Sequence, residues 1–180
     1  MEKEHVKLMV FPEFCITGYT CHDLFLQRCL LDSAWDELLH IAEETRETDA
    51  LIFVGLPLRH RGKLYNVAAA LNHGRIVGFV PKTHIPNYNE FYEQRQFAGA
   101  EEEDVEFVDF LKCEKNEEDE FWDEIPFGTE LIFECKEFPE FTVAAELCED
   151  LWVPVPPSIR HAINGAHIIV NLSASDEMVG

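Results

Sequence analysis

The stretch FTVAAELCEDLW, residues 141–152, is a mostly apolar run that ends in a cysteine followed at once by two carboxylates. The run 141–147 is typical of a strand buried in a sheet. Negative charges beside a thiol raise its pKa and make it less reactive. Cys148 is therefore either a buried structural cysteine beside a solvated acidic turn, or a nucleophile whose activating cation comes from elsewhere in the chain.

Other apolar runs predict an α/β domain with a mixed sheet, because strands alternate with helices and hairpins. A three-residue hairpin loop is expected at 72–74. Ser33, Ser158 and Asp23 are expected to cap helices. The first strand is expected to be buried on both faces of its sheet. The remaining predicted strands are 6–11, 50–58, 64–71, 75–80, 130–135 and 167–173, and the predicted helices are 23–31, 33–47 and 159–166.

The composition suits one globular domain and argues against several classes of partner. Of the 180 residues 47% are hydrophobic, and no apolar run approaches the roughly 20 residues that a membrane-spanning helix needs. The net charge of −21 disfavours nucleic acid and anionic membranes as partners. The N-terminus lacks the apolar core of a signal peptide, which indicates a cytoplasmic protein. The six cysteines include no C-x-x-C pair, so free thiols are expected.

Residues 101–124 contain 13 acidic and two basic residues and so hold more than half of the net charge. We expect them to form a solvated acidic insertion. Interleaved aromatic and aliphatic side chains leave open a role in docking a partner. The segment lacks the D-x-[DN]-x-[DN]-G pattern of a calcium loop, and we expect no metal site in the chain.

Three predicted strands end directly in ionisable side chains. Glu13 and Lys82 each follow a strand and a proline, and Cys148 follows the run at 141–147. Each alone has an ordinary explanation, as a solvated loop residue or a structural cysteine. Ligands of open α/β sheets gather beyond the carboxyl ends of the strands. The three side chains are therefore expected to meet in one site.

The chemistry of these three side chains is complementary. Glu13 can accept the thiol proton of Cys148 and later return it to a departing amine. The ammonium group of Lys82, with a backbone N–H near the nucleophile, can stabilise the oxyanion that forms when a thiolate attacks an amide carbonyl. Lys82 also offsets the carboxylates that flank Cys148. The set favours amide hydrolysis.

Extended blocks around these residues resemble a known family. PEF-x-x-TGY (12–19), VPKTHIPNYNEFYE (80–93) and ELCEDLW (146–152) resemble the Glu-Lys-Cys motifs of the carbon-nitrogen hydrolase, or nitrilase, superfamily. Further blocks, among them LYNVAA (64–69) and NLSAS (171–175), look like the glutaminase domains of its glutamine-dependent NAD+ synthetase subfamily. The resemblance spans nearly the whole chain outside the acidic segment.

The resemblance implies catalytic roles for four side chains. Glu13 would be the general base, Lys82 the oxyanion stabiliser and Cys148 the nucleophile. Glu90, in the NEFYE block, matches a second glutamate that many family members place near the lysine and the cysteine.

The resemblance also implies a glutamine pocket. The residues implied to line it are Tyr19, Tyr88, Glu149 and Ser175. The carboxylate of Glu149 would suit the α-ammonium group of the substrate, whereas Asp150 is expected only to hold the turn. Aromatic packing remains the alternative for the two tyrosines.

The implied fold is an α-β-β-α sandwich with mixed sheets, incomplete at both ends. Residues 1–180 would be a partial glutaminase domain with an acidic insertion at about 101–124. The implied function is glutamine hydrolysis that releases ammonia for the ATP-dependent amidation of deamido-NAD to NAD. No cofactor is expected in this domain, and ATP and Mg would bind a synthetase domain. The implied partners are glutamine, that synthetase domain and further copies of the chain.

Two other interpretations stay open. The chain is alternatively a stand-alone nitrilase-type amidase that acts on another small amide. A non-catalytic, truncated interaction module is the second alternative, although the intact set of Glu13, Lys82 and Cys148 argues against it.

Overall fold

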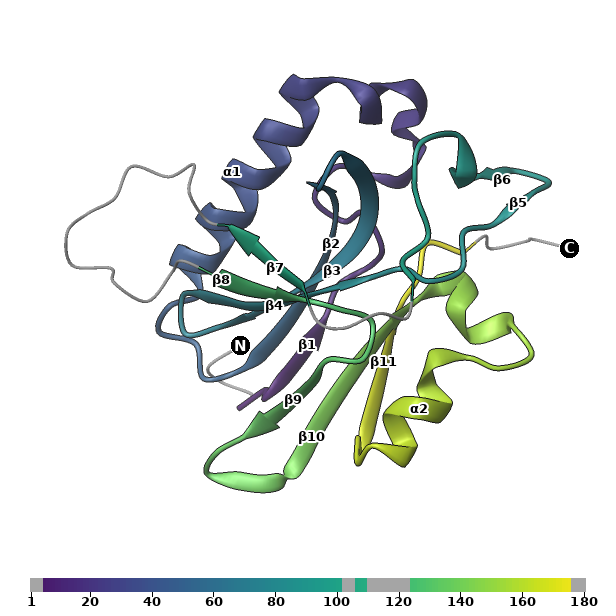
Figure 1. Cartoon of the computed structure of the whole chain (residues 1–180). Helices are drawn as coiled ribbons and strands as arrows, with labels where there is room; N and C mark the ends of the chain where they lie inside the picture. The colour runs from purple at the N-terminus through teal and green to yellow at the C-terminus, as the bar shows by residue number, and fades with distance from the viewer. Residues whose placement is uncertain (1–4, 102–105, 110–123, 176–180) are drawn as a thin grey trace, which may run out of the picture.

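The computed structural model describes residues 5–101, 106–109 and 124–175 (Figure 1). The strands of a larger sheet are β1 (Leu8–Val10), β2 (Leu51–His60), β3 (Lys63–Asn72), β4 (Arg75–Pro81), β7 (Glu106–Asp109) and β8 (Glu124–Phe127). The strands of a smaller sheet are β9 (Ile132–Cys135), β10 (Phe138–Leu147) and β11 (Ile168–Leu172), and a separate pair is β5 (Asn87–Tyr88) with β6 (Phe91–Tyr92). The helices are α1 (Arg28–Glu44) and α2 (Pro157–Ile163), and the 3-10 turns are η2 (Tyr19–Leu26), η3 (Glu93–Arg95) and η4 (Cys148–Trp152).

The elements form four layers, with the two sheets between the two helices (Figure 1). The larger sheet has the order β1-β2-β3-β4-β8-β7 and the smaller one the order β11-β10-β9, and both mix parallel with antiparallel pairs. Helix α1 packs on the larger sheet and α2 on the smaller one. The predicted α-β-β-α sandwich with mixed sheets is confirmed.

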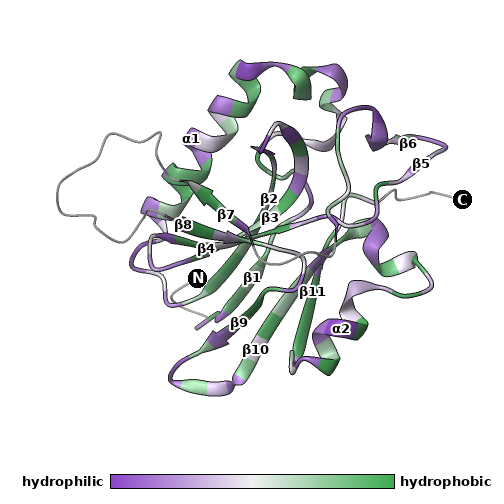
Figure 2. Ribbon diagram, viewed as in Figure 1, coloured by the Kyte–Doolittle hydropathy of each residue, from purple (hydrophilic) through white to green (hydrophobic). Residues whose placement is uncertain are grey.

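Strand β3 shows why the sheets form two apolar layers. Its side chains alternate between the two faces of the larger sheet. Ala68 and Ala70 pack against β10 and β11, whereas Val67, Ala69 and Leu71 pack on the side of α1. The hydrophobic colour along much of β2, β3 and the second half of β10 in Figure 2 follows from this burial on both faces.

The hairpin between β3 and β4 has a two-residue loop, so the predicted three-residue loop is wrong. Asn72 pairs with Arg75, and His73 and Gly74 have φ values of 47° and 78°. A positive φ at both central residues is the signature of a type I′ turn, whose twist matches that of the flanking strands.

The predicted helix caps and the burial of the first strand are also wrong. Helix α1 runs unbroken through Ser33 from Arg28, and α2 begins at Pro157, one residue before Ser158. Asp23 lies within η2 and accepts hydrogen bonds from side chains of η3 and its neighbour instead of capping a helix. Strand β1 is at the edge of its sheet, and Val10 is 41% exposed.

The ends of the acidic segment belong to the larger sheet. Strands β7 and β8 pair antiparallel, and Val108 and Ile125 are buried in the core beside α1. The predicted insertion therefore includes ordered strands at its margins. Residues 102–105 and 110–123 lie outside the described residues. They carry most of the charge of the segment and most of the side chains considered for docking a partner.

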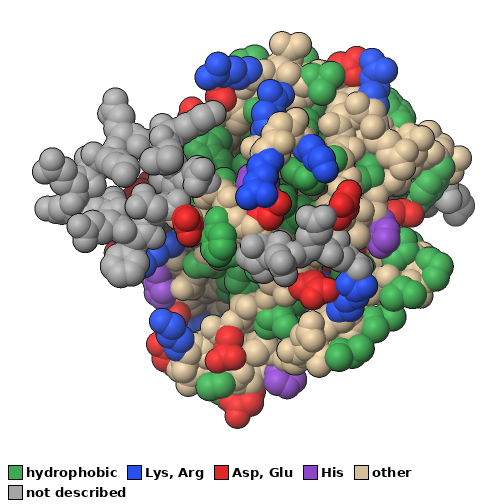
Figure 3. Space-filling view, in the orientation of Figure 1, with side chains coloured by type: hydrophobic (Ala, Val, Ile, Leu, Met, Phe, Trp, Pro, Cys, Tyr) green, Lys and Arg blue, Asp and Glu red, His purple; other side chains and the backbone are tan. Residues whose placement is uncertain are grey.

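The surface over η4 and α2 is unusually apolar. Trp152 is 70% exposed, Val155 63% and Ile163 78%, and Figure 3 shows hydrophobic side chains gathered over α2. Among the described residues, no helix has the length and hydropathy to cross a bilayer. The five cysteines in the described ranges are free, as the sequence predicts.

Candidate active site

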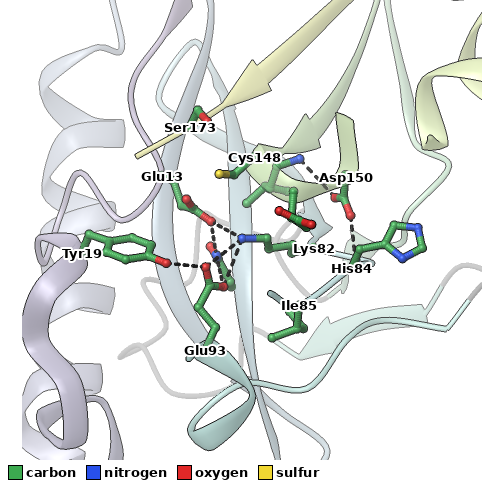
Figure 4. Close-up of polar contacts among 12 residues, drawn as sticks. Glu13, Tyr19, Lys82, His84, Ile85, Glu93, Cys148, Asp150 and Ser173 are labelled. Atoms are coloured by element: carbon green, nitrogen blue, oxygen red, sulfur yellow. Dashed lines mark hydrogen bonds and ion pairs between the residues drawn. The ribbon is translucent and has the colours of Figure 1, made fainter. Parts of the chain in front are cut away.

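Glu13, Lys82 and Cys148 lie together where strands of both sheets end (Figure 4). Glu13 lies in the turn after β1, Lys82 directly follows β4, and Cys148 directly follows β10. The first two come from the larger sheet and the third from the smaller one. The site therefore spans two facing sheets instead of lying along the edge of one.

Lys82 lies at the centre of a buried ionic cluster. Its Nζ donates to Oε1 of Glu13 at 2.7 Å and to the two carboxylate oxygens of Glu93 at 2.9 and 3.1 Å. The side chains of Lys82 and Glu13 are fully buried, and that of Glu93 is 6% exposed. An ammonium group buried this deeply requires such partners, because the cost of removing it from water is large.

Glu93, and not Glu90, is the second glutamate beside Lys82. Glu90 is exposed in the turn between β5 and β6, and no bond joins it to Lys82. The NEFYE block contains both glutamates, three residues apart. The tight turn at Asn89, where φ is 50°, carries Glu90 past the cluster and leaves Glu93 at the start of η3 to reach it. The sequence-based assignment of Glu90 is thus corrected.

Asn66 is a member of the cluster that the sequence analysis did not assign to the site. It is fully buried, and its Nδ2 donates to Oε1 of Glu13 at 2.6 Å and to Oε2 of Glu93 at 3.4 Å. The available signal was a lone amide in the otherwise apolar run LYNVAAAL, which a buried strand tolerates only when the amide has partners. Asn66 therefore fixes both carboxylates relative to each other.

The cluster shifts the pKa values of its members in ways that suit proton transfer. Burial raises the pKa of the Glu13 carboxyl, and the ammonium group of Lys82 only partly opposes this. Burial alone would lower the pKa of Lys82, but the charges of Glu13 and Glu93 outweigh it and the net shift is upward. Oε2 of Glu13 has no hydrogen-bond partner in the part of the chain that the structure describes. Glu13 thus has one oxygen held by Lys82 and Asn66 and one oxygen free to accept a proton.

Cys148 lies in a strained turn at the end of β10. Its φ of 43° is rare for a residue other than glycine, and such strain is often stored at reactive residues. Burial, followed by the charge of Glu13, raises the pKa of the thiol, and a hydrogen bond with Ser173 opposes this. The sequence indicated that the two carboxylates after Cys148 raise its pKa, but the main causes are burial and the charge of Glu13.

Two neighbouring residues support the turn from the side of the smaller sheet. Nδ2 of Asn171 donates to the carbonyl oxygen of Cys148 and to Oε1 of Glu146, both at 3.4 Å. Oε2 of Glu146 accepts from the backbone N–H of Ser158 at the start of α2 at 3.1 Å. The strained backbone at Cys148 is therefore tied to both β11 and α2.

Tyr19 contacts the cluster through Glu93. Its hydroxyl donates to Oε1 of Glu93 at 2.6 Å, and its ring packs against Phe14 and Phe91. Burial and this hydrogen bond to a carboxylate raise the pKa of Tyr19. The side chain thus combines the aromatic packing that the sequence left open with a polar contact to the site.

Tyr88 and Glu149 lie at an open pocket beside the cluster. The hydroxyl of Tyr88 donates to Oε2 of Glu149 at 2.7 Å, which raises the pKa of Tyr88 to about 12. The pocket has a volume of about 570 Å³, and Thr83, next to Lys82, also lines it. Ser175 is exposed, and its hydroxyl is 2.9 Å from that of Ser173, which contacts Cys148.

Comparison with known proteins agrees with this geometry. The family model described as carbon-nitrogen hydrolase matches residues 1–179, and the chain belongs to this family. Glutamine-dependent NAD(+) synthetase of Mycobacterium tuberculosis (strain H37Rv) is 38% identical over 174 residues, which are 96% of this chain and 24% of that protein. The protein of the same name from Aquifex aeolicus is 32% identical over 177 residues. The chain spans about a quarter of the length of these curated relatives.

Solved structures extend the comparison to the fold. A glutamine-dependent NAD(+) synthetase from Cytophaga hutchinsonii superposes with a TM-score of 0.80 at 28% identity, over 99% of this chain and 26% of that one. Nit3 of Saccharomyces cerevisiae, a nitrilase-superfamily member, superposes with a TM-score of 0.62 at 17% identity, over 94% of this chain and 52% of that one. The second likeness supports the sandwich fold alone.

Proposed function

We propose that the chain is the glutamine-hydrolysing part of a glutamine-dependent NAD+ synthetase. The observation that carries the proposal is the buried Glu13–Lys82 pair beside Cys148, in which one oxygen of Glu13 has no partner among the described residues. The identity of 32–38% to relatives of that name supports glutamine as the amide.

The reaction begins with the transfer of the Cys148 thiol proton to Oε2 of Glu13. The raised pKa of Glu13 makes this carboxylate a stronger base than an exposed one. The sulfur then bonds to the amide carbon of glutamine, and the carbonyl oxygen becomes an oxyanion. Lys82 keeps its charge and stabilises that oxyanion, because its pKa is raised.

Collapse of this intermediate breaks the carbon–nitrogen bond. Glu13 returns the proton to the nitrogen, ammonia leaves, and a glutamyl thioester remains on Cys148. Water then attacks the thioester carbon while Glu13 accepts one of its protons. Breaking the carbon–sulfur bond releases glutamate, and the proton returns to the sulfur of Cys148. Glu13 thus acts as base and acid in alternation.

Glutamine would bind at the pocket beside Cys148. The carboxylate of Glu149 is suited to bind the α-ammonium group of the substrate. Its Oε2 accepts a hydrogen bond from the hydroxyl of Tyr88, which holds it in place. The hydroxyl of Ser175 contacts that of Ser173, whose hydrogen bond reaches Cys148, so Ser175 is proposed to complete the binding site. Tyr19 contributes through Glu93, by holding a carboxylate that binds Lys82.

The released ammonia would serve the ATP-dependent amidation of deamido-NAD by a synthetase domain. ATP and Mg would bind there and not at the cluster described above. Glutamine and that domain are the proposed partners. Assembly into homo-oligomers and a cytoplasmic location stay predictions.

Labelling of Cys148 tests this function. In the full-length protein, a glutamine-like diazoketone is expected to modify Cys148, as seen by mass spectrometry, and Cys148→Ala should abolish ammonia release from glutamine. A variant that keeps its glutaminase activity without the thiol contradicts the proposal. A substrate panel in which another small amide is hydrolysed faster than glutamine would favour a nitrilase-type amidase instead.

A further inference from the structure

Asp150 makes contacts that extend beyond its own turn. The side chain is 1% exposed, and its Oδ1 accepts from the backbone N–H of His84 at 2.7 Å and of Thr83 at 3.2 Å. Its Oδ2 accepts from the N–H of Leu147 at 3.2 Å and is 3.3 Å from the nitrogen of Thr83. The carboxylate thus binds the two residues that follow Lys82 and the residue that precedes Cys148 (Figure 4).

These hydrogen bonds cross between the two sheets. Lys82 follows a strand of the larger sheet and Cys148 a strand of the smaller one. Among the described residues no strand of one sheet pairs with a strand of the other. The sheets are held by apolar packing, in which Val80 and Leu147 share one core cluster. Apolar packing is not directional, so by itself it does not fix the distance between an ammonium group and a sulfur atom.

A buried carboxylate provides the direction that apolar packing lacks. Hydrogen bonds weaken steeply away from their preferred geometry, and a buried donor left unpaired is costly. Within the described residues every hydrogen bond of Asp150 is with an N–H donor, so its surroundings suit an ionised carboxylate. Burial raises the pKa of Asp150, and the backbone N–H groups that donate to it oppose that shift. A second polar link, between Tyr88 and Glu149, is exposed at the pocket, where a substrate would disturb it.

We infer that Asp150 is a positioning residue that holds Lys82 in register with Cys148 for the proposed reaction. It touches neither the substrate nor the reacting atoms and acts through the backbone on both sides. The inference rests on the proposed glutaminase function, in which Lys82 must reach the oxyanion formed at Cys148. A displacement of about 1 Å between reacting groups lowers a rate by roughly 100-fold.

Asp150→Asn in the full-length protein is the sharpest test. Asparagine keeps the volume but has one acceptor oxygen, so it can bind the segment after Lys82 or the residue before Cys148, not both. We expect kcat for glutamine to fall roughly 100-fold. KM should rise by a much smaller factor than kcat falls, since the segment after Lys82 lines the pocket but Tyr88 and Glu149 keep the hydrogen bond that joins them there. The alkylation of Cys148 by iodoacetamide should also slow.

Thr142→Val is the matched control. Thr142 lies on β10 away from the site, is 7% exposed, and its hydroxyl bonds to Gly165 and His167. Its loss should lower thermal stability as the loss of other buried hydrogen bonds does, while kcat stays at the wild-type value. If Asp150→Asn keeps kcat within about threefold of wild type, or if Thr142→Val loses as much, the inference is wrong.

Hydrogen exchange in the wild-type protein keeps the inference testable if Asp150→Asn fails to fold. Thr83 and His84 follow the end of β4 and belong to none of the described strands, so their amides should exchange slowly only because Asp150 binds them. They should exchange together with that of Leu147, and rapid exchange of the first two would refute the tie. A wild type that does not hydrolyse glutamine refutes the proposed function alone, since hydrogen exchange and thiol alkylation still test the geometry.

Discussion

Replacing Glu93 by glutamine removes one of the two carboxylates that bind the buried ammonium group of Lys82. Glutamine has nearly the same shape, and its carbonyl oxygen can still accept one hydrogen bond. Glu13 remains bonded to Lys82 at 2.7 Å. The substitution therefore tests the charge of Glu93 with little change in packing.

The expected magnitude follows from the contacts. Two unit charges about 3 Å apart attract by about 5 kcal/mol at an effective dielectric constant of 20, and the cost of burying Glu93 offsets much of this. Hydrogen bonds to charged groups contribute about 1.5–3 kcal/mol net. We expect Glu93→Gln to lower the free energy of unfolding by about 2 kcal/mol. A loss of the same size in transition-state stabilisation would lower kcat/KM roughly 30-fold.

The pH dependence has a definite sign. The charges of Glu13 and Glu93 raise the pKa of Lys82, so the loss of Glu93 lowers it. Less of Lys82 then carries a proton as the pH rises, and the defect of Glu93→Gln should grow toward alkaline pH. Ammonia release by the variant and the wild type, measured with a coupled dehydrogenase assay between pH 6 and 9, would show whether the defect grows. Urea denaturation would measure the change in stability.

Glu90→Gln is the control that separates the two glutamates of the NEFYE block. Glu90 is exposed and is not bonded to Lys82, so the activity and the stability of the Glu90→Gln variant should stay close to those of the wild type. The reasoning fails if Glu93→Gln keeps kcat/KM within about threefold of wild type, or if Glu90→Gln is equally impaired.

Two further substitutions test the charge and the position of Glu13. Glu13→Gln removes a charge that raises the pKa of Cys148, so iodoacetamide should alkylate the thiol faster at neutral pH, whereas glutamine turnover should fall by at least about 100-fold because the base is lost. Slower alkylation would contradict the assigned charge effect. Gly55→Ala would place a Cβ 2.5 Å from the backbone nitrogen of Phe14 and 2.8 Å from Cα of Glu13, so we expect about 1–3 kcal/mol of lost stability in urea and displacement of Glu13. Unchanged stability and turnover would show that this turn has room to move.

Local patterns in the sequence were sufficient for most of the strands and for an α/β domain with a mixed sheet, whereas the four-layered sandwich was implied by the family resemblance. Strand β3 lies over the predicted run at 64–71, and β10 includes the predicted run at 141–147. A buried strand is recognised in the sequence as a continuous apolar run. The end of that run also identifies the side chain that follows the strand. Glu13, Lys82 and Cys148 could be singled out for this reason.

Helix ends and turns were predicted less well, because tertiary contacts compete with local signals. Asp23 has a side chain suited to capping, yet Arg95 binds it with two hydrogen bonds at 2.7 and 2.8 Å. Ser33 lies inside α1, where the helix continues because its apolar face packs on the larger sheet. The free energy of that packing exceeds the roughly 1 kcal/mol that a cap contributes.

The composition of the site was decided by the tertiary structure. The sequence alone determined which strands end in reactive side chains. A strand and the residue that follows it are recognised from an apolar run of neighbouring residues, without knowledge of tertiary contacts. The sequence did not determine that Glu93 instead of Glu90 reaches Lys82, that Asn66 joins two carboxylates, or that Asp150 ties two sheets together. The contacts of Glu93 with Lys82 and of Asp150 with Leu147 are short-range, at 11 and 3 positions, whereas the other contacts of Asn66 and Asp150 join residues 27 to 67 positions apart. The contacts of Asn66 and Glu93 depend on how strands and loops of the larger sheet come together, and those of Asp150 with the segment after Lys82 on how the two sheets pack face to face. Apolar packing is not directional, so a few buried polar groups decide the relative position of the sheets.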